Sequence, residues 1–528
     1  MLPAPNSPNL LSSSLGLSLI AQIFLIPTVS ILLYIIKYVL QQLLFVDKTQ
    51  PPVVFSWLPL IGSTVEYGIE PYKFYAKYQK KFGDVFTFVL IGRKHTVCLG
   101  PNGNNFVLNS SLSETSAADI YRDLTVPIFG KDVCYDCSPA KFMEQKKFMK
   151  YSLTPEKLQR YIPLFLHETR DYIQSASCFQ GNEGIFDVVE NMSPLTLFTA
   201  SATLQGKEVR ENMNGNLAHL YHDLDKSFIP INFYMPGLPL PVNRARDIAR
   251  KKIVNIYKDI ITSRRANHSG QTEDDMIGNL IRSTYKDGSP VADHEIAHTM
   301  IGLLMAGQHN TYSVASWILL RLATRPDLQE ELYQEQKSVF GSELDLNASY
   351  DDIDRLSLHK MVARETLRLH EPIHTMLRAV KKPLTILSKD PETSSDRMYR
   401  IPKTHILIAA PGVTCRSEEF FHNPEEWEPR RWESKTKPSD DTQKSTLELS
   451  DLSRGANSPY LPFGAGRHRC VGESFVYLHL CTMVAYLVHH FTFENLPGKV
   501  GIPLTDFSSM ITRPIVPARL VWKRRTRN

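Results

Sequence analysis

One cysteine near the C-terminal end of the chain stands in a loop whose composition suits a bound metal cofactor. The loop is Pro462 to Ser474, PFGAGRHRCVGES. Its glycines would allow a tight turn that lies close against a flat molecule, because glycine has no side chain to hold the backbone away. Arg467, His468 and Arg469 would favour the thiolate form of Cys470, and a thiolate is a ligand for haem iron. The alternative is a glycine-rich turn around a buried thiol.

The elements that would position this loop are mainly helical. The run from about Asp293 to Ala323 has apolar residues nearly all round and ends before Pro326, which predicts a long helix through the interior. A second helix is expected from Tyr350 to His370. The strand-like stretches are Val85 to Leu90, His95 to Leu99, Thr404 to Ala409 and Ile515 to Trp522. The fold class is therefore mainly α with a small β region.

The N-terminal region has the composition of a membrane anchor. No charged side chain precedes Lys37, and the apolar stretch from about Leu15 to Ile36 is long enough to cross a bilayer. Lys37 and Lys48 follow this stretch, and the positive-inside bias then leaves the remainder of the chain in the cytoplasm. A buried or interfacial helix is the alternative interpretation. We therefore expect a transmembrane anchor and hinge over residues 1–50 and one catalytic domain over residues 51–528.

Composition and charge argue against several other classes of protein. The chain has 528 residues, and its 60 Lys and Arg against 55 Asp and Glu give a net charge of +5 that is spread along the length, so nucleic-acid binding is not indicated. The seven cysteines are too few and too scattered for a disulfide framework. Cys134 and Cys137 have the C-x-x-C spacing without a second pair, so we interpret them as structural. The polar stretch from Lys435 to Ser458 predicts a surface insertion.

The cysteine loop resembles the haem-binding loop of cytochromes P-450, F-x-x-G-x-R-x-C-x-G. Phe463, Gly466, Cys470 and Gly472 match this pattern, whereas His468 stands where most of the family has arginine. That variation resembles the sterol 14α-demethylase branch. The resemblance extends over essentially everything after the anchor. It implies the cytochrome P-450 fold, with a single large haem domain in which Cys470 is the axial ligand of the iron of haem b.

Two further signatures of the family stand in the expected order. Glu365-Thr-Leu-Arg368 lies in a predicted helix, where positions i and i+3 share a face, and Pro429-Arg-Arg431-Trp432 follows it. The resemblance implies that Glu365, Arg368 and Arg431 form a charged cluster that braces the fold. Taken alone, an E-x-x-R pattern is more often a surface ion pair.

The centre of the long predicted helix, AGQHNT at residues 306–311, resembles the oxygen-activating segment A-G-x-[D/E]-T of the family. Gly307 would leave room for O2 beside the iron. His309 replaces the acidic residue, again as in sterol demethylases, and the resemblance pairs it with Asp225 on an earlier helix. Imidazole titrates near neutrality and a carboxylate can fix its tautomer, so we expect a proton relay. A polar pair that merely satisfies two buried groups is the alternative.

One position of this segment departs from the family pattern. Asn310 stands where most members have threonine, and an amide cannot donate a hydroxyl proton. We expect the neighbouring Thr311, or an ordered water, to substitute for it.

The carboxylate-bearing side chains of haem need hydrogen-bond donors, which phenol, ammonium, guanidinium and imidazole groups can supply. The candidates are Tyr121, Tyr135, Lys146, Arg378 and His468. The segment from Tyr121 to Lys150 also resembles the part of fungal sterol demethylases that covers the haem and begins the substrate pocket. Together with Cys470, the loop residues Phe463, Gly464 and Gly472 complete the expected cofactor contacts.

The expected substrate wall is apolar with few polar atoms, which suits a large rigid hydrophobic molecule with one hydroxyl group. Any one of its aromatic residues, taken singly, is more often generic core. The stretch-by-stretch likeness to sterol demethylases selects the wall residues Leu124, Thr125, Phe129, Phe228, Pro230, Ala306, Ile373, His374, Met376, Ser509 and Met510.

The resemblance implies an oxidoreductase that removes the 14α-methyl group of lanosterol or eburicol in ergosterol-type biosynthesis. Three oxygenations would consume O2 and NADPH. Because the chain has no flavin or nicotinamide motif, the electrons would come from an NADPH-cytochrome P-450 reductase, with cytochrome b5 as a second donor. Arg467, Arg469 and Lys147 are the expected docking residues. The endoplasmic reticulum membrane, a cytosol-facing catalytic domain and azole inhibitors are further expectations.

Three other functions stay open at this point. The first is a P-450 that acts on another lipid, which product analysis with 14α-methyl sterols would separate. The second is a thiolate-haem isomerase or dehydratase that needs no reductase, which dependence on NADPH and reductase would exclude. The third is a catalytically idle haem-binding protein or sterol carrier, which would give no turnover.

Overall fold

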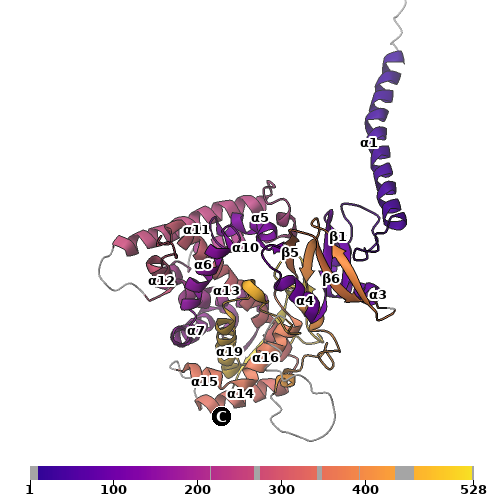
Figure 1. Cartoon of the computed structure of the whole chain (residues 1–528). Coiled ribbons are helices and arrows are strands. Elements are labelled where there is room, and N and C mark those ends of the chain that lie inside the picture. The colour runs from indigo at the N-terminus through magenta and orange to yellow at the C-terminus, as the bar shows by residue number, and fades with distance from the viewer. Residues whose placement is uncertain are drawn as a thin grey trace, which may run out of the picture.

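A helical body surrounds a long central helix, and a region of small sheets lies at one side of it (Figure 1). The computed structural model describes residues 10–213, 216–266, 274–341, 348–391, 393–433 and 457–525. The helices of the body are α2 (Thr64–Ile69), α3 (Pro71–Phe82), α4 (Gly100–Leu108), α5 (Ala118–Phe129), α6 (Pro139–Tyr151), α7 (Pro155–Ser175), α8 (Val188–Ala200), α9 (Lys207–Asn212), α10 (Asn216–Asp225), α11 (Pro241–Ala266), α12 (Met276–Arg282), α13 (Asp293–Leu322), α14 (Pro326–Phe340), α15 (Tyr350–Asp354), α16 (Ser357–Leu369), α17 (Pro411–Thr414) and α19 (Glu473–His490). The shorter helical turns are η1 (Ser177–Phe179), η2 (Ser201–Gln205), η3 (Pro230–Phe233), η4 (Pro429–Trp432) and η5 (Gly466–His468). The predicted polar insertion, Lys435 to Ser458, lies outside the described residues apart from its last two.

The predicted central helix is α13, which runs through the middle of the helical body (Figure 1). Most of its 30 residues are buried, and α8, α11, α16 and α19 pack against it. A helix can be surrounded in this way because its sequence is apolar on nearly every side. The middle of α13 therefore lies deep in the protein.

The single helix predicted from Tyr350 to His370 is wrong, because the chain forms two helices there, α15 and α16, separated near Arg355. The Glu335 carboxylate of α14 accepts hydrogen bonds from the backbone N–H groups of Leu358 and His359. Those N–H groups have no partner within a helix that begins at this point, so Glu335 caps the start of α16. The break thus depends on a residue from another helix.

Within the described residues the strands form four small sheets, the largest of which has the order β1-β2-β8-β5-β3. In that sheet β2 and β8 are parallel and the other pairs are antiparallel. The strands are β1 (Val85–Leu90), β2 (Arg93–Cys98), β3 (Thr115–Ser116), β4 (Glu183–Asp187), β5 (Met376–Val380), β6 (Leu384–Lys389), β7 (Asp396–Ile401), β8 (Ile406–Ala409), β9 (Phe491–Asn495), β10 (Thr505–Asp506), β11 (Arg513–Pro514) and β12 (Arg519–Arg524). The strand predicted from Ile515 starts later, at Arg519, because Pro517 has no N–H to donate to a ladder.

Helix α1 (Leu10–Leu44) extends away from the body (Figure 1). Within the described part of the chain, its stretch Phe24–Leu44 is long and apolar enough to cross a membrane, and it is not covered by the rest of the protein. Near the end of the helix the Tyr38 hydroxyl lies 2.7 Å from Ser56 Oγ, and Gln42 donates to Ser56 O over 2.9 Å. The chain after α1 thus turns back onto the last turns of the helix.

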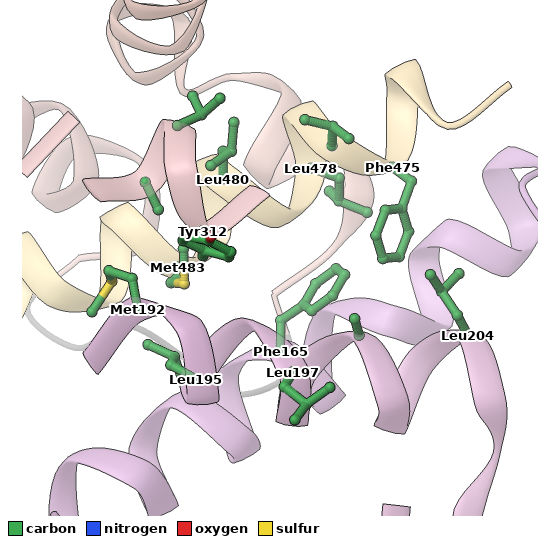
Figure 2. Packing of buried hydrophobic residues seen from close by; sticks show 14 of the residues in the cluster. Phe165, Met192, Leu195, Leu197, Leu204, Tyr312, Phe475, Leu478, Leu480 and Met483 are labelled. Atoms are coloured by element: carbon green, nitrogen blue, oxygen red, sulfur yellow. The ribbon is translucent and has the colours of Figure 1, made fainter. Parts of the chain in front are cut away.

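The largest hydrophobic cluster fixes α13 relative to the helix that follows the cysteine loop. Figure 2 shows part of this cluster, with Phe165 from α7, Met192 from α8, Tyr312 from α13 and Met483 from α19. Complete burial of a side chain of this size stabilises a fold by roughly 1.5–3 kcal/mol. Because α19 begins directly after the loop, this packing also sets where Cys470 stands relative to α13.

Candidate active site

The cysteine loop is shaped by two glycines in the left-handed backbone region. Gly464 has a φ of +67° and Gly466 a φ of +66°, which other residues adopt only with strain. A Cβ atom at Gly466 would lie 2.5 Å from Leu108 O, so this glycine also lets the loop lie against the end of α4. There the Arg467 guanidinium donates to Ser110 O over 3.1 Å. The loop is thereby held against α4.

Cys470 lies inside the protein, yet the residue is accessible. The Cys470 N–H donates to Phe463 O over 3.0 Å, and its Sγ accepts the N–H of Gly472 over 3.3 Å. Ala306 is also exposed, although it stands in the middle of α13. An accessible alanine on a helix packed by other helices indicates space beside that helix. The structure thus gives both the cysteine loop and the centre of α13 an open side.

The predicted positive surroundings of Cys470 are largely compensated. Arg469 pairs with Glu473 at 2.6 Å. Burial and nearby cations lower the pKa of His468 to about 3, so its imidazole is neutral near pH 7. Burial raises the pKa of the Cys470 thiol, and the Gly472 N–H opposes this only in part. Burial therefore outweighs the basic neighbours Lys146 and Arg469, which do lower the pKa of the Cys470 thiol as expected.

Four of the five predicted haem-carboxylate donors lie together. The rings of Tyr121 and Tyr135 stack with centroids 5.0 Å apart, and those of Tyr135 and His468 stack at 5.7 Å. Burial raises the pKa of Tyr121 and Tyr135 and lowers that of His468, and the charge of Arg378 acts on all three groups, which places the guanidinium among them. Arg378 is 6% exposed and donates to Leu377 O, and within the described part of the chain it forms no ion pair. A buried cation without a carboxylate favours an anionic ligand.

Lys146 differs from the other four donors. Its Nζ donates to Arg467 O over 2.8 Å and to Arg469 O over 2.7 Å. The structure shows a clamp between α6 and the cysteine loop that uses two of the three donors of the ammonium, and donation to a haem carboxylate stays a prediction. Backbone carbonyls in the loop compete for the ammonium, which the sequence pattern does not reveal.

These residues fit haem, a flat cofactor with two carboxylates and an iron that binds thiolate. The Tyr121 hydroxyl accepts the Leu377 N–H over 2.9 Å and keeps its own proton to donate. His468 Nδ1 is buried and, among the described residues, has no hydrogen-bond partner. Arg378 supplies a positive charge that would compensate the haem carboxylates. Donors, charge and sulfur are thus all present for this group.

His309 and Asp225 meet deep in the protein. The Nδ1 atom of His309 lies 3.1 Å from Oδ1 of Asp225, the last residue of α10. The two atoms are close but not aligned as a hydrogen bond. His309 is 3% exposed, and the ring of Phe228 lies with its centroid 6.5 Å from the imidazole. The fold therefore brings together the two residues that the sequence pairs.

Opposing charges act on His309. Burial is the main influence and lowers its pKa, whereas the Asp225 carboxylate raises it. Arg513 and His222 add to the lowering. The ring is therefore neutral near pH 7 and able to accept a proton.

The positions that flank this histidine have different contacts. A Cβ atom at Gly307 would lie 2.9 Å from Leu204 Cδ1, so the missing side chain allows the close packing of α13 against η2. Thr311 Oγ1 donates to Gly307 O over 2.6 Å. Asn310 Nδ2 donates to Ala306 O over 3.0 Å, while its Oδ1 is buried with no hydrogen-bond partner among the described residues. Both polar side chains thus bind carbonyls of their own helix.

Part of the predicted substrate wall gathers around Phe228. The rings of Phe129 and Phe228 have centroids 6.1 Å apart, and Ser509 Oγ donates to Phe228 O over 3.3 Å. Met510 packs against the apolar cluster that contains Tyr121. Pro230 begins η3 and has accessible surface. These contacts join α5, the segment after α10 and the β10–β11 hairpin.

A second part of the wall lies near β5 and the cysteine loop. His374 Nε2 lies 3.4 Å from the Tyr67 hydroxyl, and burial lowers the pKa of this histidine to about 4. Met376 Sδ would lie 3.4 Å from a Cβ at Gly464, which places the methionine beside the loop. Ile373 is 39% exposed.

Leu124 and Thr125, two further residues of the predicted wall, are buried in α5. Leu124 is 1% exposed and belongs to the main hydrophobic core. Thr125 is 6% exposed, and its Oγ1 donates to Tyr121 O within α5. The helix turns both side chains into the core, an orientation that depends on its tertiary packing.

The Glu365, Arg368 and Arg431 cluster is buried and richly hydrogen-bonded. Glu365 Oε1 lies 2.7 Å from Arg368 Nη2 and 2.9 Å from Arg431 Nε, and Oε2 accepts from Trp432 Nε1 over 2.9 Å. Arg368 also donates to backbone carbonyls within residues 415–426. Glu365 and Arg368 are 0% exposed. The three charged residues that the sequence groups therefore tie α16 to η4 and the segment before it.

Sequence reasoning missed three residues of the site. Tyr312 lies one helical turn beyond His309, with ring centroids 5.7 Å apart, and helical spacing could have found it. Phe142 packs on His468 at 5.2 Å. Arg513 lies on a distant hairpin, and only the fold brings it near His309.

Comparisons with known proteins agree with this arrangement. The family model described as Cytochrome P450 matches residues 51–522. An eburicol 14-alpha-demethylase of Uncinula necator is 48% identical over 95% of this chain and 96% of its own length. A sterol 14-alpha demethylase of Aspergillus flavus is 48% identical over 94% of this chain and 95% of its own. A sterol 14-alpha demethylase of Aspergillus fumigatus is 46% identical over 95% and 97%, respectively.

A solved structure shows the same fold at lower sequence identity. The retinoic acid-bound cyanobacterial CYP120A1 covers 91% of this chain and 100% of its own, with a TM-score of 0.74 and 19% identity. The cysteine loop, the buried Glu–Arg–Arg cluster and the match along nearly the whole chain lead to one assignment. The chain belongs to the cytochrome P450 family, in the group that includes the fungal sterol 14-alpha demethylases.

Proposed function

We propose that this protein removes the 14α-methyl group of a sterol precursor such as lanosterol or eburicol, as an O2- and NADPH-dependent monooxygenase of sterol biosynthesis. The observation that carries the proposal is the contact between His309 and Asp225, in a chain that resembles eburicol and sterol 14-alpha demethylases along its length. Three oxygenations would take the methyl group to alcohol, aldehyde and formate. Each needs protons at a buried site.

Cys470 would hold the iron of haem b as its axial ligand. Arg378, Tyr121, Tyr135 and His468 would hold the two carboxylates, because they supply positive charge and polar ring atoms without a nearby acid. When bound, thiolate-ligated haem supplies the activation of O2. The role of the protein is to position the sterol and to deliver protons.

His309 is the proton carrier in this proposal. Its Nδ1 faces Asp225 and takes up a proton there, and its Nε2 releases one on the opposite side of the ring. Because burial lowers the pKa of His309, the ring gives up this proton readily. Thr311, or an ordered water, would take the place of the threonine that Asn310 replaces, because the Asn310 amide is bound to Ala306 O.

A rigid sterol nucleus with one hydroxyl group suits the side chains around this site. Polar atoms are few there, and His374 and Ser509 are the candidates for the hydroxyl contact. The apolar contacts would come from Phe129, Phe228, Pro230, Ala306, Ile373, Met376 and Met510.

The proposal includes a division into an anchor and hinge, residues 1–50, and a catalytic domain, residues 51–528. The uncovered apolar stretch of α1 supports anchoring in the endoplasmic reticulum membrane, with the catalytic domain in the cytosol. Electrons would come from NADPH-cytochrome P450 reductase, and from cytochrome b5 as a second donor. The exposed Lys147 and the partly exposed Arg469 suit an acidic docking surface. Azole inhibitors would occupy the sterol site.

The test is reconstitution of the full-length chain with reductase and NADPH, with lanosterol or eburicol as substrate and a fatty acid for comparison. We expect formate and the 14-demethylated sterol only when NADPH and reductase are both present. Oxidation of the fatty acid alone would indicate another lipid substrate, and turnover without reductase would indicate an isomerase or dehydratase. In this assay His309→Ala should lose most of the sterol turnover. His294→Ala serves as its control, because His294 is a partly exposed histidine on the same helix.

A further inference from the structure

A carboxylate–arginine pair on the C-terminal hairpin stands beside the relay. Asp506 of β10 is the direct cross-strand partner of Arg513 in β11, and Arg513 Nε lies 3.3 Å from Asp506 Oδ2. The hairpin is fixed to the central helix, because Ser313 Oγ donates to Thr512 O over 2.5 Å. Thr512 Oγ1 also donates to Glu371 O over 2.8 Å. The backbone that carries Arg513 is therefore held against α13.

The Arg513 guanidinium faces two side chains of α13. It lies within interaction range of the Tyr312 hydroxyl and of the His309 imidazole, and Asp225 interacts with the same two groups. Tyr312 follows His309 by one helical turn, and the two rings meet edge to face. His309 thus stands between a carboxylate and a guanidinium.

Exposure rises along this series of charged groups. The side chain of His309 is 4% exposed, that of Asp225 is 20%, that of Asp506 is 23% and that of Arg513 is 35%. The charged groups therefore connect a buried imidazole with the edge of the protein. Arg513 lies in the segment FSSMITRP, from which the family resemblance selects Ser509 and Met510, but that resemblance gives no role to Arg513 or Asp506.

We propose that Arg513, held by Asp506, is a positioning residue that acts through His309 and keeps the imidazole from retaining the proton it accepts. The inference rests on the proposed function, since it assumes that His309 relays protons. A cation near an imidazole disfavours the protonated ring, whereas the Asp225 carboxylate favours it. The two charges together leave the ring neutral at rest and ready to release a proton.

The titratable and charged groups near His309 come from α10, from α13 itself and from the β10–β11 hairpin. They are Asp225 and His222 from α10, Tyr312 from α13 and Arg513 from β11, with Asp506 of β10 behind Arg513. Substitution of Arg513 or Asp506 leaves the His309–Asp225 contact itself in place. These two residues are therefore the appropriate positions for a test of how nearby charge acts on His309.

Two substitutions of this pair should move the pKa of His309 in opposite directions. Arg513→Gln removes the repelling cation, so the pKa should rise, by on the order of half a unit to one unit. Asp506→Asn leaves the Arg513 charge uncompensated, so the pKa should fall. Arg519→Gln should leave the pKa of His309 unchanged, because Arg519 is an exposed arginine on β12, the next strand along the chain.

The first readout is the pKa of His309 itself. Nitrogen NMR of histidine-labelled, haem-loaded enzyme in the ferrous carbon monoxide form would follow the ring through a pH titration, with the signal assigned by its loss in His309→Gln. The second readout is the acid limb of the pH profile for sterol turnover, because only a neutral ring can accept a proton. That limb should move to higher pH in Arg513→Gln and to lower pH in Asp506→Asn.

Opposite shifts of the His309 pKa in the two variants would support the inference. Shifts in the same direction, or none in either variant, would overturn it. If the pKa shifts oppositely but the wild-type enzyme does not demethylate sterols, the proposed function fails while the action of Arg513 on His309 stands. Arg513→Lys keeps the charge, so it should retain the wild-type pKa. Arg513→Met, which also removes the charge, replaces Arg513→Gln if that variant does not fold.

Discussion

Two buried clusters of acid and base differ in how completely their polar atoms are satisfied. In the first, both carboxylate oxygens of Glu365 accept well-placed donors, among them Arg368 and Arg431. In the second, His309 lies beside Asp225 without an aligned hydrogen bond. A satisfied buried network makes the structure rigid, whereas one with unsatisfied atoms can rearrange and exchange a proton. Hydrogen-bond completeness, rather than residue type, separates the bracing cluster from the proposed proton relay.

The largest expected effect comes from breaking the satisfied cluster. Arg368→Ala leaves the Glu365 carboxylate buried without its main partner, which should destabilise the fold by about 3–5 kcal/mol. Urea unfolding, together with the yield of soluble haem-loaded protein, measures this loss. A variant with near wild-type unfolding midpoint would show that the cluster does not brace the fold.

A substitution in the second cluster should lower activity rather than stability. His309→Ala removes the proton carrier, so sterol turnover should fall about 10²-fold or more. Azole binding, followed by spectral titration, should be largely retained because the pocket walls remain. Equal loss of turnover and azole binding would show that His309 is needed for folding. The two clusters would then not differ in function.

A buried histidine outside both clusters gives a smaller, pH-dependent effect. His479 Nε2 lies 2.7 Å from Thr199 Oγ1, and burial lowers the pKa of His479 to about 3. The unfolded chain protonates this ring near pH 6.5, so stability is intact above that pH and declines as the pH falls from there towards about 3, by up to about 1.4 kcal/mol per pH unit. His479→Gln should therefore flatten the acid dependence of the urea midpoint. An unchanged slope would contradict the assignment of a neutral buried ring.

The smallest loss of stability is expected at Arg430, which directly precedes Arg431 of the bracing cluster. Arg430 is exposed and pairs with Glu331 and Glu433 at the surface, where an ion pair contributes about 1 kcal/mol or less. Arg430→Ala should barely change the unfolding midpoint, whereas Arg431→Ala should lower it clearly because Arg431 binds the buried Glu365. Similar losses in the two variants would remove the distinction between surface and buried charge.

Sequence reasoning succeeded where a short segment carries the information. The cysteine loop, the centre of α13 and the pair Glu365 and Arg368 are local patterns, and the chemistry of each follows from residues within one or two turns. The match of Asp225 to His309 came from family resemblance, since no local signal joins them.

The parts that could not be predicted depend on tertiary packing. Lys146 binds carbonyls of a loop that is distant in sequence, and Leu124 turns towards the core because of the helices around α5. The break between α15 and α16 involves Glu335 of another helix. Arg513 reaches His309 only through the hairpin that Ser313 holds on α13.

The central claim, that Cys470 binds haem iron as a thiolate, is tested most directly by the carbon monoxide difference spectrum of the reduced protein. Wild type and Cys481→Ala, which alters a buried cysteine of α19, should both give the band of thiolate-ligated haem. Cys470→Ala should lose that band. Its retention in Cys470→Ala, or its absence from haem-loaded wild type, would contradict the account.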